Sequence, residues 1–308
     1  MMITTVCLNP SFDMTVEVDG FTPYEVNRIR SVRRDMGGKG LNVAIVAHRL
    51  GLDVQCLGCM GEDDADTLTQ MINREGLKHS FLRVPGRVRT NTKIVSRDGK
   101  GTTELNEPGE AIPPEQLKWF TAMAKEHIGE KDLVVLTGSL PPECPQTAYR
   151  DMMTALGGHR CILDAQGEAL LAGAEAQPLL IKPNLHELER TLGIELRTLR
   201  SIRDAAMIFL HKGVQHVMVS MGSMGAMYVS KKNTLYAPAL RVEASSTVGA
   251  GDAMLGGILK GMAVEGDMAK AFRYGVAAGA ASVMTEGTQL IRREDFERLL
   301  TQVRVQEV

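Results

Sequence analysis

Four short apolar runs between residues 130 and 230 each end abruptly in polar or glycine residues. The runs occupy residues 133–136, 161–163, 179–181 and 217–219. Apolar runs without alternation are typical of strands buried on both faces, and the spacers between them are long enough to hold crossover helices. The sequence therefore predicts an α/β protein with a mainly parallel sheet covered by helices. In such sheets the ligand crevice lies beyond the carboxyl ends of the strands, where these polar clusters fall.

Two stretches break this pattern, at about residues 13–35 and 81–107. In the first, residues 15–18 alternate strictly, and in the second a strand-like run at 92–96 precedes a turn signal at 97–100. Half-exposed antiparallel strands of this kind predict a small sheet that projects from the main body. We interpret the 308 residues as one domain with these two insertions. Because a few-stranded sheet with one apolar face is marginal alone, a dimer is plausible.

Charged residues are nearly balanced, with 35 Lys and Arg against 37 Asp and Glu. This balance gives no reason to expect a nucleic-acid or acidic-membrane partner, and no apolar run approaches the roughly 18 residues of a membrane span. The five cysteines form no regular framework, which fits a reducing compartment and predicts a cytoplasmic protein. Cys56 and Cys59 have zinc-knuckle spacing, but without a second pair we expect buried strand residues.

The run Ser-Thr-Val-Gly-Ala-Gly-Asp at residues 246–252 places three small residues and a carboxylate at the start of a predicted helix. The apolar residues that indicate this helix are spaced i, i+3, i+4 and i+7, namely Leu255, Ile258, Leu259 and Met262. The unpaired N–H groups at Gly249, Ala250 and Gly251 can hold an anion. Asp252 would repel a phosphate, but it suits a base that takes a proton from an attacking hydroxyl. An ordinary glycine-rich loop with Asp in the first helical turn is the alternative.

A second glycine cluster, Gly-Gly-Lys-Gly-Leu-Asn-Val-Ala at residues 37–44, runs into another apolar helix through Leu50. Its spacing matches neither the Walker loop nor the dinucleotide fingerprint, and the second mismatch counts against a dehydrogenase. Together, the segments 37–44 and 246–252 resemble the two signatures of the ribokinase-like carbohydrate kinases, the PfkB family. The resemblance covers the whole chain. It implies a three-layer α/β/α domain with a small β-sheet lid, ATP and Mg²⁺ as cofactors, and a homodimer that pairs through the lid.

Further segments resemble one branch of this family, the 1-phosphofructokinases and tagatose-6-phosphate kinases. They lie at residues 5–13, 25–28, 87–91, 103–109, 137–142 and 182–187. Ribokinases commonly carry Asp where this chain has Ser246, and the difference favours the sugar-phosphate branch. The resemblance implies ATP-dependent phosphorylation of a ketohexose monophosphate, with fructose 1-phosphate, phosphorylated on its 6-hydroxyl, as the leading expectation. Tagatose-6-phosphate kinase, 6-phosphofructokinase and a non-catalytic sugar-phosphate sensor are the alternatives.

The expected roles on the sugar side centre on Asp252 as general base, with the backbone of residues 249–251 stabilising the transferring phosphoryl group. Asp13 is expected to accept hydrogen bonds from sugar hydroxyls. Gly37, Gly38 and Asn42 are expected to border the same sugar, and helix capping is the alternative role for Asn42.

The phosphate that the acceptor already carries needs cations, and the candidates are Arg28, Lys39 and Arg89. Arg89 is the strongest of them because a guanidinium offers two-pronged phosphate recognition. Lys39 takes a position that many sugar kinases fill with a non-basic residue, which indicates a phosphorylated acceptor. Ser139 follows a buried strand and either contacts substrate or only forms a turn.

On the nucleotide side, the resemblance implies that Lys182, Asn184 and Glu187 organise the phosphates of ATP and the magnesium ion. Magnesium keeps several waters and needs few protein ligands, so Glu187 and Asn184 are expected to act on it through water. An exposed helix position is the alternative for Glu187. The residues expected to seat the nucleotide are Ser220, Gly222, Gly225, Thr247, Gly249 and Gly251.

Overall fold

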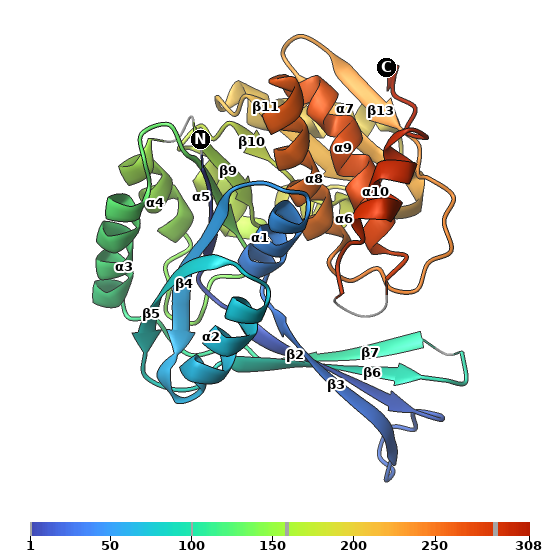
Figure 1. Ribbon diagram of the computed structural model, residues 1–308. Helices are drawn as coiled ribbons and strands as arrows, with labels where there is room; N and C mark the ends of the chain where they lie inside the picture. The colour runs from blue at the N-terminus through green and yellow to red at the C-terminus, as the bar shows by residue number, and fades with distance from the viewer. Residues whose placement is uncertain (1, 100, 158–159, 286–288) are drawn as a thin grey trace.

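Two sheets of unequal size organise the chain in the computed structural model, which describes residues 2–99, 101–157, 160–285 and 289–308 (Figure 1). Over these residues the larger sheet has ten strands and the smaller has four. Helices cover both faces of the large sheet, whereas the small sheet projects from the main body (Figure 1).

The large sheet is parallel across most of its width and antiparallel at one edge, which confirms the mainly parallel sheet that the sequence predicts. Its parallel strands are, in spatial order, β11 (His216–Ser220), β10 (Leu180–Ile181), β9 (Cys161–Asp164), β8 (Leu133–Thr137), β1 (Ile3–Cys7), β4 (Val54–Gly61) and β5 (Lys78–Val84). Beyond β11, the antiparallel strands are β12 (Ala226–Ser230), β13 (Thr234–Ala237) and β14 (Gln306–Glu307). The four apolar runs are β8 to β11.

The central strands are buried on both faces, because neighbouring residues of one strand belong to different hydrophobic cores. Val135 of β8 packs in one core and Val134 in the other. The first core is shared by α1 (Lys39–Arg49), α2 (Ala65–Arg74), α8 (Ala250–Glu265), α9 (Met268–Ser282) and α10 (Arg293–Leu300). The second is shared by α3 (Pro114–His127), α4 (Ala148–Leu156), α5 (Gly167–Ala174), α6 (Leu185–Leu192) and α7 (Leu199–His211). The layers are therefore α/β/α, as expected.

The small sheet, which we call the lid, contains four strands. In spatial order they are β3 (Ile29–Gly37), β2 (Ser11–Val18), β6 (Arg89–Ser96) and β7 (Gly101–Asn106). The hairpin expected around residues 97–100 is confirmed as the β6–β7 connection, apart from residue 100, which lies outside the described residues. Two details differ from expectation. The central pair β2–β6 is parallel, because the chain returns to the main body between these strands. Residues 81–84 belong to β5 of the large sheet, so the second lid stretch begins at Arg89.

Cys56 and Cys59 lie in β4, and both are buried free thiols, as expected for strand residues. The other cysteines, Cys7, Cys144 and Cys161, are also buried and free. Among the described residues, no helix combines the length and the hydrophobicity that crossing a membrane requires.

Helices α8 and α9 pack closely because glycines face the partner helix. A methyl group added at Gly257 would overlap the carbonyl oxygen of Tyr274 and lie 2.5 Å from Cβ of Ala278. At Gly279, on α9, the nearest atom to an added methyl is the carbonyl oxygen of Ala250 at 3.4 Å. This packing matters for the site, because α8 begins at the cavity described below.

We expect Gly257→Ala to destabilise the fold by about 1–3 kcal/mol, because overpacking costs more than the gain in helix propensity. Gly279→Ala is the matched control, and it should leave the unfolding free energy unchanged or slightly raised. Urea unfolding followed by circular dichroism measures both. Equal effects of the two substitutions would contradict the packing described here.

Candidate active site

A cavity of about 1140 Å³ opens where the carboxyl ends of the parallel strands meet the lid. Its lining includes Asp164 at the end of β9, Lys182 just after β10 and Ser220 at the end of β11. The N-termini of α1, α6 and α8 and one face of the lid complete it. The polar clusters that follow the apolar runs therefore converge as the sequence predicts.

The N-terminus of α8 opens into this cavity without a side-chain cap. Gly249 precedes the helix with φ of 78°, a left-handed conformation that favours glycine. The ammonium of Lys182 lies beside the first turn, 3.3 Å from where a β-carbon on Gly251 would stand. The uncapped helix start, the positive end of the helix dipole and a buried cation thus face the same point, which suits an anion such as a phosphoryl group.

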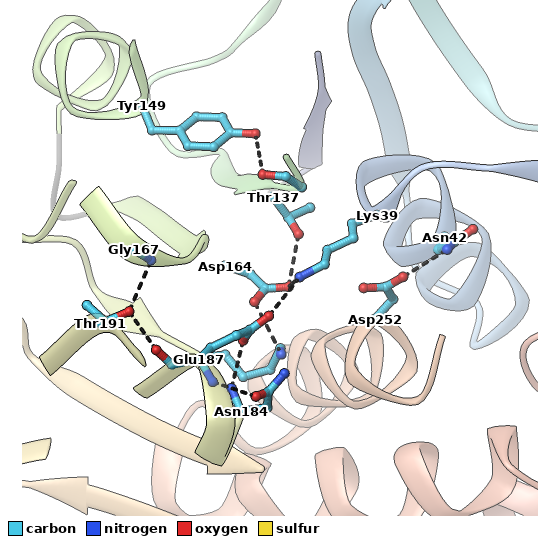
Figure 2. Close-up of polar contacts among 12 residues, drawn as sticks. Lys39, Asn42, Thr137, Tyr149, Asp164, Gly167, Asn184, Glu187, Thr191 and Asp252 are labelled. Carbon is cyan, nitrogen blue, oxygen red and sulfur yellow. Dashed lines mark hydrogen bonds and ion pairs between the residues drawn. The ribbon is translucent and has the colours of Figure 1, made fainter. Parts of the chain in front are cut away.

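Asp252 lies in the first turn of α8 and is almost fully buried. The side-chain amide of Asn42 on α1 donates a hydrogen bond of 2.8 Å to its Oδ2 (Figure 2). Burial raises the pKa of Asp252 to about 6, and this shift is opposed by the positive charge of Lys39 and by the Asn42 hydrogen bond. A carboxylate with this pKa is mostly ionised at neutral pH and remains able to accept a proton.

Lys39 and Lys182 hold a buried carboxylate between them. Nζ of Lys182 lies 3.3 Å from Oδ1 of Asp164, and Nζ of Lys39 lies 3.6 Å from Oδ2. Thr137 donates a hydrogen bond of 3.0 Å to the same carboxylate. Burial alone would raise the pKa of Asp164, but the two ammonium groups and Thr137 hold it below its usual value. Asp164 is therefore an anion in the floor of the cavity.

Asn184 and Glu187 form a capping box at the start of α6. The backbone N–H of Glu187 donates to the side chain of Asn184, and the backbone N–H of Asn184 donates to Oε2 of Glu187, each at 2.8 Å. Oε1 of Glu187 then faces Lys39 at 3.4 Å (Figure 2). The carboxylate is 12% exposed, so the alternative of an exposed helix residue is wrong.

A magnesium ion was expected near Glu187 and Asn184. The amide oxygen of Asn184 already accepts the capping hydrogen bond, so the available anionic donors are Glu187 and Asp164. Oδ1 of Asp164 is buried and faces the ammonium of Lys182 at 3.3 Å, without the geometry of a hydrogen bond. Over the ranges that the structure describes, no three His, Cys, Asp or Glu side chains gather closely enough to enclose a metal. The residues fit a hydrated ion that keeps most of its waters rather than a closed protein cage.

The sugar side of the cavity is built around Asp13 on β2. Its Oδ1 accepts hydrogen bonds from Ser11 at 2.9 Å and from Asn91 at 3.0 Å. Gly37 packs directly behind this carboxylate, because a β-carbon there would lie 2.5 Å from it. Gly37 thus supports Asp13 and is not among the lining residues, whereas Gly38, Asn42 and Arg89 line the cavity. Asn42 does not cap α1, because Gly38 is the N-cap.

Two of the three candidate phosphate-binding cations line the cavity, and protein groups already engage both. Arg89 lines the cavity, with its guanidinium donating to the backbone carbonyls of Asn9 and Glu107. Lys39 also lines it, but its ammonium faces Asp164 and Glu187. Arg28 is exposed on the lid and does not line the cavity.

Ser139 is exposed and lies outside the cavity lining. Its hydroxyl accepts a long hydrogen bond of 3.4 Å from the side-chain amide of Asn9. This placement favours the turn-forming role over substrate contact.

The residues expected to seat the nucleotide gather at the other end of the cavity. Ser220, Gly222, Gly225 and Thr247 all line it. Gly225 has a φ of 94°, and a β-carbon there would overlap the carbonyl oxygen of Ala237. The close approach of β13 explains why glycine occupies this position.

Among the cavity residues that had no role in the sequence analysis are Asn91, Lys93 and Asp164. Asp164 directly follows a predicted strand, so the rule that places ligands beyond the strand ends could have selected it. Asn91 and Lys93 stand two and four residues after Arg89 on β6, where a period of two places all three on one face.

A buried carboxylate beside an uncapped helix N-terminus, on a three-layer α/β/α fold, suits a phosphotransferase with an alcohol as acceptor. The model of the family described as pfkB family carbohydrate kinase matches residues 7–294. The chain belongs to this family of carbohydrate kinases.

Relatives of the chain match it over nearly their whole length. A 1-phosphofructokinase of Rhodobacter capsulatus is 37% identical over 308 residues, covering 99% of this chain and 98% of the relative. A 1-phosphofructokinase of Escherichia coli K12 is 33% identical over 310 residues, with the same coverage. Among solved structures, phosphofructokinase-2 of Escherichia coli in complex with substrates and products superposes with a TM-score of 0.92. It is 27% identical and covers 98% of this chain and 99% of its own.

Replacing Lys39 should move the pH dependence of catalysis. Its positive charge lowers the pKa of Asp252, so Lys39→Met should raise that pKa further above 6. Because the base must be deprotonated, kcat/KM should fall with acid below about pH 6 in the unchanged enzyme, and at higher pH in the variant. Lys125→Met, on the exposed face of α3, is the control. If the fall of kcat/KM on the acid side occurs at the same pH in the variant, or at a lower pH, Lys39 does not lower the pKa of Asp252.

Proposed function

We propose that the chain is an ATP-dependent 1-phosphofructokinase, which converts fructose 1-phosphate to fructose 1,6-bisphosphate. The observation that carries the proposal is the buried Asp252 beside the open N-terminus of α8, because it combines a base with an anion site. The relatives named 1-phosphofructokinase, at 33% and 37% identity over nearly the full length, support this choice of sugar phosphate.

In the proposed reaction, Asp252 accepts the proton of the sugar 6-hydroxyl as that oxygen attacks the terminal phosphorus of ATP. Asn42 holds one carboxylate oxygen and fixes its orientation, which leaves the other oxygen for the hydroxyl. A new O–P bond forms, the bond between the phosphorus and the bridging oxygen breaks, and ADP leaves with that electron pair. The N–H groups of residues 249–251 stabilise the charge on the phosphoryl group in flight.

Charge balance in the cavity supports a divalent cation. Five carboxylates line the cavity against four cations, namely Asp13, Glu104, Asp164, Glu187 and Asp252 against Lys39, Arg89, Lys93 and Lys182. The polyphosphate of ATP adds further negative charge. We propose that Glu187 and Asp164 hold a hydrated magnesium ion, which neutralises charge on the phosphates when it is bound.

Other ketohexose phosphates use the same chemistry. Tagatose 6-phosphate and fructose 6-phosphate each offer a free hydroxyl at the end opposite their phosphate, and Asp252 does not distinguish these ends by itself. The solved relative named phosphofructokinase-2 is less identical to this chain, at 27%, than the relatives named 1-phosphofructokinase. Comparison of kcat/KM for the three sugar phosphates decides among them, and fructose 1-phosphate should give the highest value.

We expect Asp252→Asn to reduce kcat by at least 1,000-fold while fructose 1-phosphate still binds, because the amide keeps the shape but accepts no proton. Burial raises the pKa of Asp252 above its unfolded value, so the charged carboxylate lowers stability as pH rises from about 4 to 6. The variant should therefore be as stable as the unchanged protein at neutral pH, or more stable.

A coupled ADP-release assay, calorimetric binding and thermal unfolding measure these three properties. Asp66→Asn is the control, because Asp66 is an exposed carboxylate that pairs with Arg83 on the surface. Turnover of Asp252→Asn at the rate of the unchanged enzyme would reject the assignment of the base.

We also propose that two copies of the chain pair through their lids. Large hydrophobic side chains are exposed on this small sheet and its connections, namely Tyr24, Val26, Ile29, Val32 and Leu105. A concentration of exposed apolar residues on one small sheet is typical of an interaction surface. One solved relative is described as a tetrameric inhibited form of phosphofructokinase-2, which supports self-association as a property of the family. The unpaired cysteines support a reducing compartment, and we propose the cytoplasm.

The double substitution Val26→Asp with Ile29→Asp should convert the dimer into a monomer, because it buries two unpaired charges in the proposed interface. Light scattering after size-exclusion chromatography should give twice the mass of one chain for the unchanged protein and the mass of one chain for the variant. Ile194→Asp, at an exposed position between α6 and α7, should remain dimeric. A monomeric unchanged protein would contradict pairing through the lid.

A further inference from the structure

Lys93 on β6 is a buried cation whose ammonium has no hydrogen-bond acceptor among the residues that the structure describes. Its side chain is 6% exposed, yet it lines the active-site cavity. Oδ2 of Asp13 lies 3.9 Å from this ammonium, which is an ion-pair distance but too long for a hydrogen bond. A buried ammonium with three unpaired N–H donors is costly, so a ligand that supplies an acceptor here gains binding energy.

The surroundings of Lys93 point to the same need for a ligand. In the parallel pairing of β2 with β6, Asn91 lies opposite Asp13 and Lys93 lies opposite Thr15. Oδ1 of Asn91 and Oγ1 of Thr15 are also buried atoms without a hydrogen-bond partner. On the neighbouring strand β7, the residue opposite Lys93 in the strand register is Glu104. The side chain of Glu104 is exposed at the cavity edge. A row of unpaired polar atoms thus lies beside the carboxylate of Asp13.

Lys93 differs in this respect from the other cations considered for the sugar phosphate. The ammonium of Lys39 is shared between Asp164 and Glu187, and the guanidinium of Arg89 donates to two backbone carbonyls. Arg28 does not reach the cavity. Among these cations, Lys93 alone lines the cavity without a protein hydrogen bond in the described structure.

We propose that Lys93 binds the phosphate that the acceptor sugar already carries, while Asp13 binds the hydroxyl on the adjacent carbon. This inference rests on the proposed function and specifies how the substrate is selected. Asp13 and Lys93 are close enough to contact two neighbouring substituents of one sugar. In a ketose 1-phosphate ring, carbon 2 beside the phosphate-bearing carbon carries a hydroxyl. In a furanose 6-phosphate, the corresponding carbon 5 carries the ring oxygen instead, so the pair of contacts selects the 1-phosphate.

The test compares Lys93→Met and Lys93→Gln with the unchanged enzyme, using fructose 1-phosphate and fructose 6-phosphate at saturating ATP and magnesium. We expect KM for fructose 1-phosphate to rise about 10- to 100-fold in Lys93→Met, as for loss of a charge-assisted hydrogen bond, with kcat changed less than threefold. Lys93→Gln, which keeps a donor, should lose less. KM for fructose 6-phosphate should rise by a smaller factor in both variants.

Stability provides a second readout. Lys93 is the cation beside the buried carboxylate of Asp13, so Lys93→Met should lower Tm, and Lys93→Gln, which keeps a donor, should lower it less. Lys78→Met, at an exposed lysine that pairs with Asp53, is the matched control and should behave as the unchanged enzyme. An unchanged KM for fructose 1-phosphate, an equal rise for both sugar phosphates, or a lowered Tm with unchanged KM would each overturn the proposal. If the unchanged enzyme prefers another sugar phosphate, the proposed function fails, but the role of Lys93 can still be tested with that preferred substrate. An unchanged KM for it in both Lys93 variants would show that Lys93 does not bind the substrate phosphate.

Discussion

The site depends on balancing buried charge at the carboxyl ends of the parallel strands. Asp164 and Asp252 are carboxylates withdrawn from water, which is costly unless cations compensate them. Lys182 follows β10 and Lys39 begins α1, so the compensating charges come from separate elements of the fold. The attraction between these opposite charges links the sheet to α1 and keeps α1 near the start of α8. Asp252 is compensated least, and its pKa of about 6 is the consequence.

The lid is joined to this charged centre through very short connections. Three residues separate the end of β1 from β2, which carries Asp13, and one residue separates β3 from α1, which carries Lys39 and Asn42. The lid strands and the helix that carries Asn42 are therefore almost continuous pieces of chain. In the proposed reaction, this continuity would let a projecting sheet position an acceptor hydroxyl accurately beside Asp252.

Much of this arrangement could be predicted from the sequence, because it follows from local patterns. Unalternating apolar runs indicated the buried strands, and glycines next to Asp252 indicated an open helix start. The contacts of Lys39 and Lys93 could not be predicted from such local patterns. Lys39 stands in a glycine cluster, but its ammonium is directed by Asp164 and Glu187, which are distant in sequence. Lys93 lies beside Asp13 because β2 and β6 pair in parallel, a register that no local pattern reveals.

The most direct test of this account is a crystal structure with fructose 1-phosphate, magnesium and a non-hydrolysable ATP analogue. The account predicts the sugar 6-hydroxyl within about 2.6–3.2 Å of an Asp252 carboxylate oxygen, and the terminal phosphoryl group against the N–H groups of residues 249–251. A sugar bound with its 6-hydroxyl away from Asp252, or a nucleotide whose terminal phosphate lies apart from the start of α8, would contradict it.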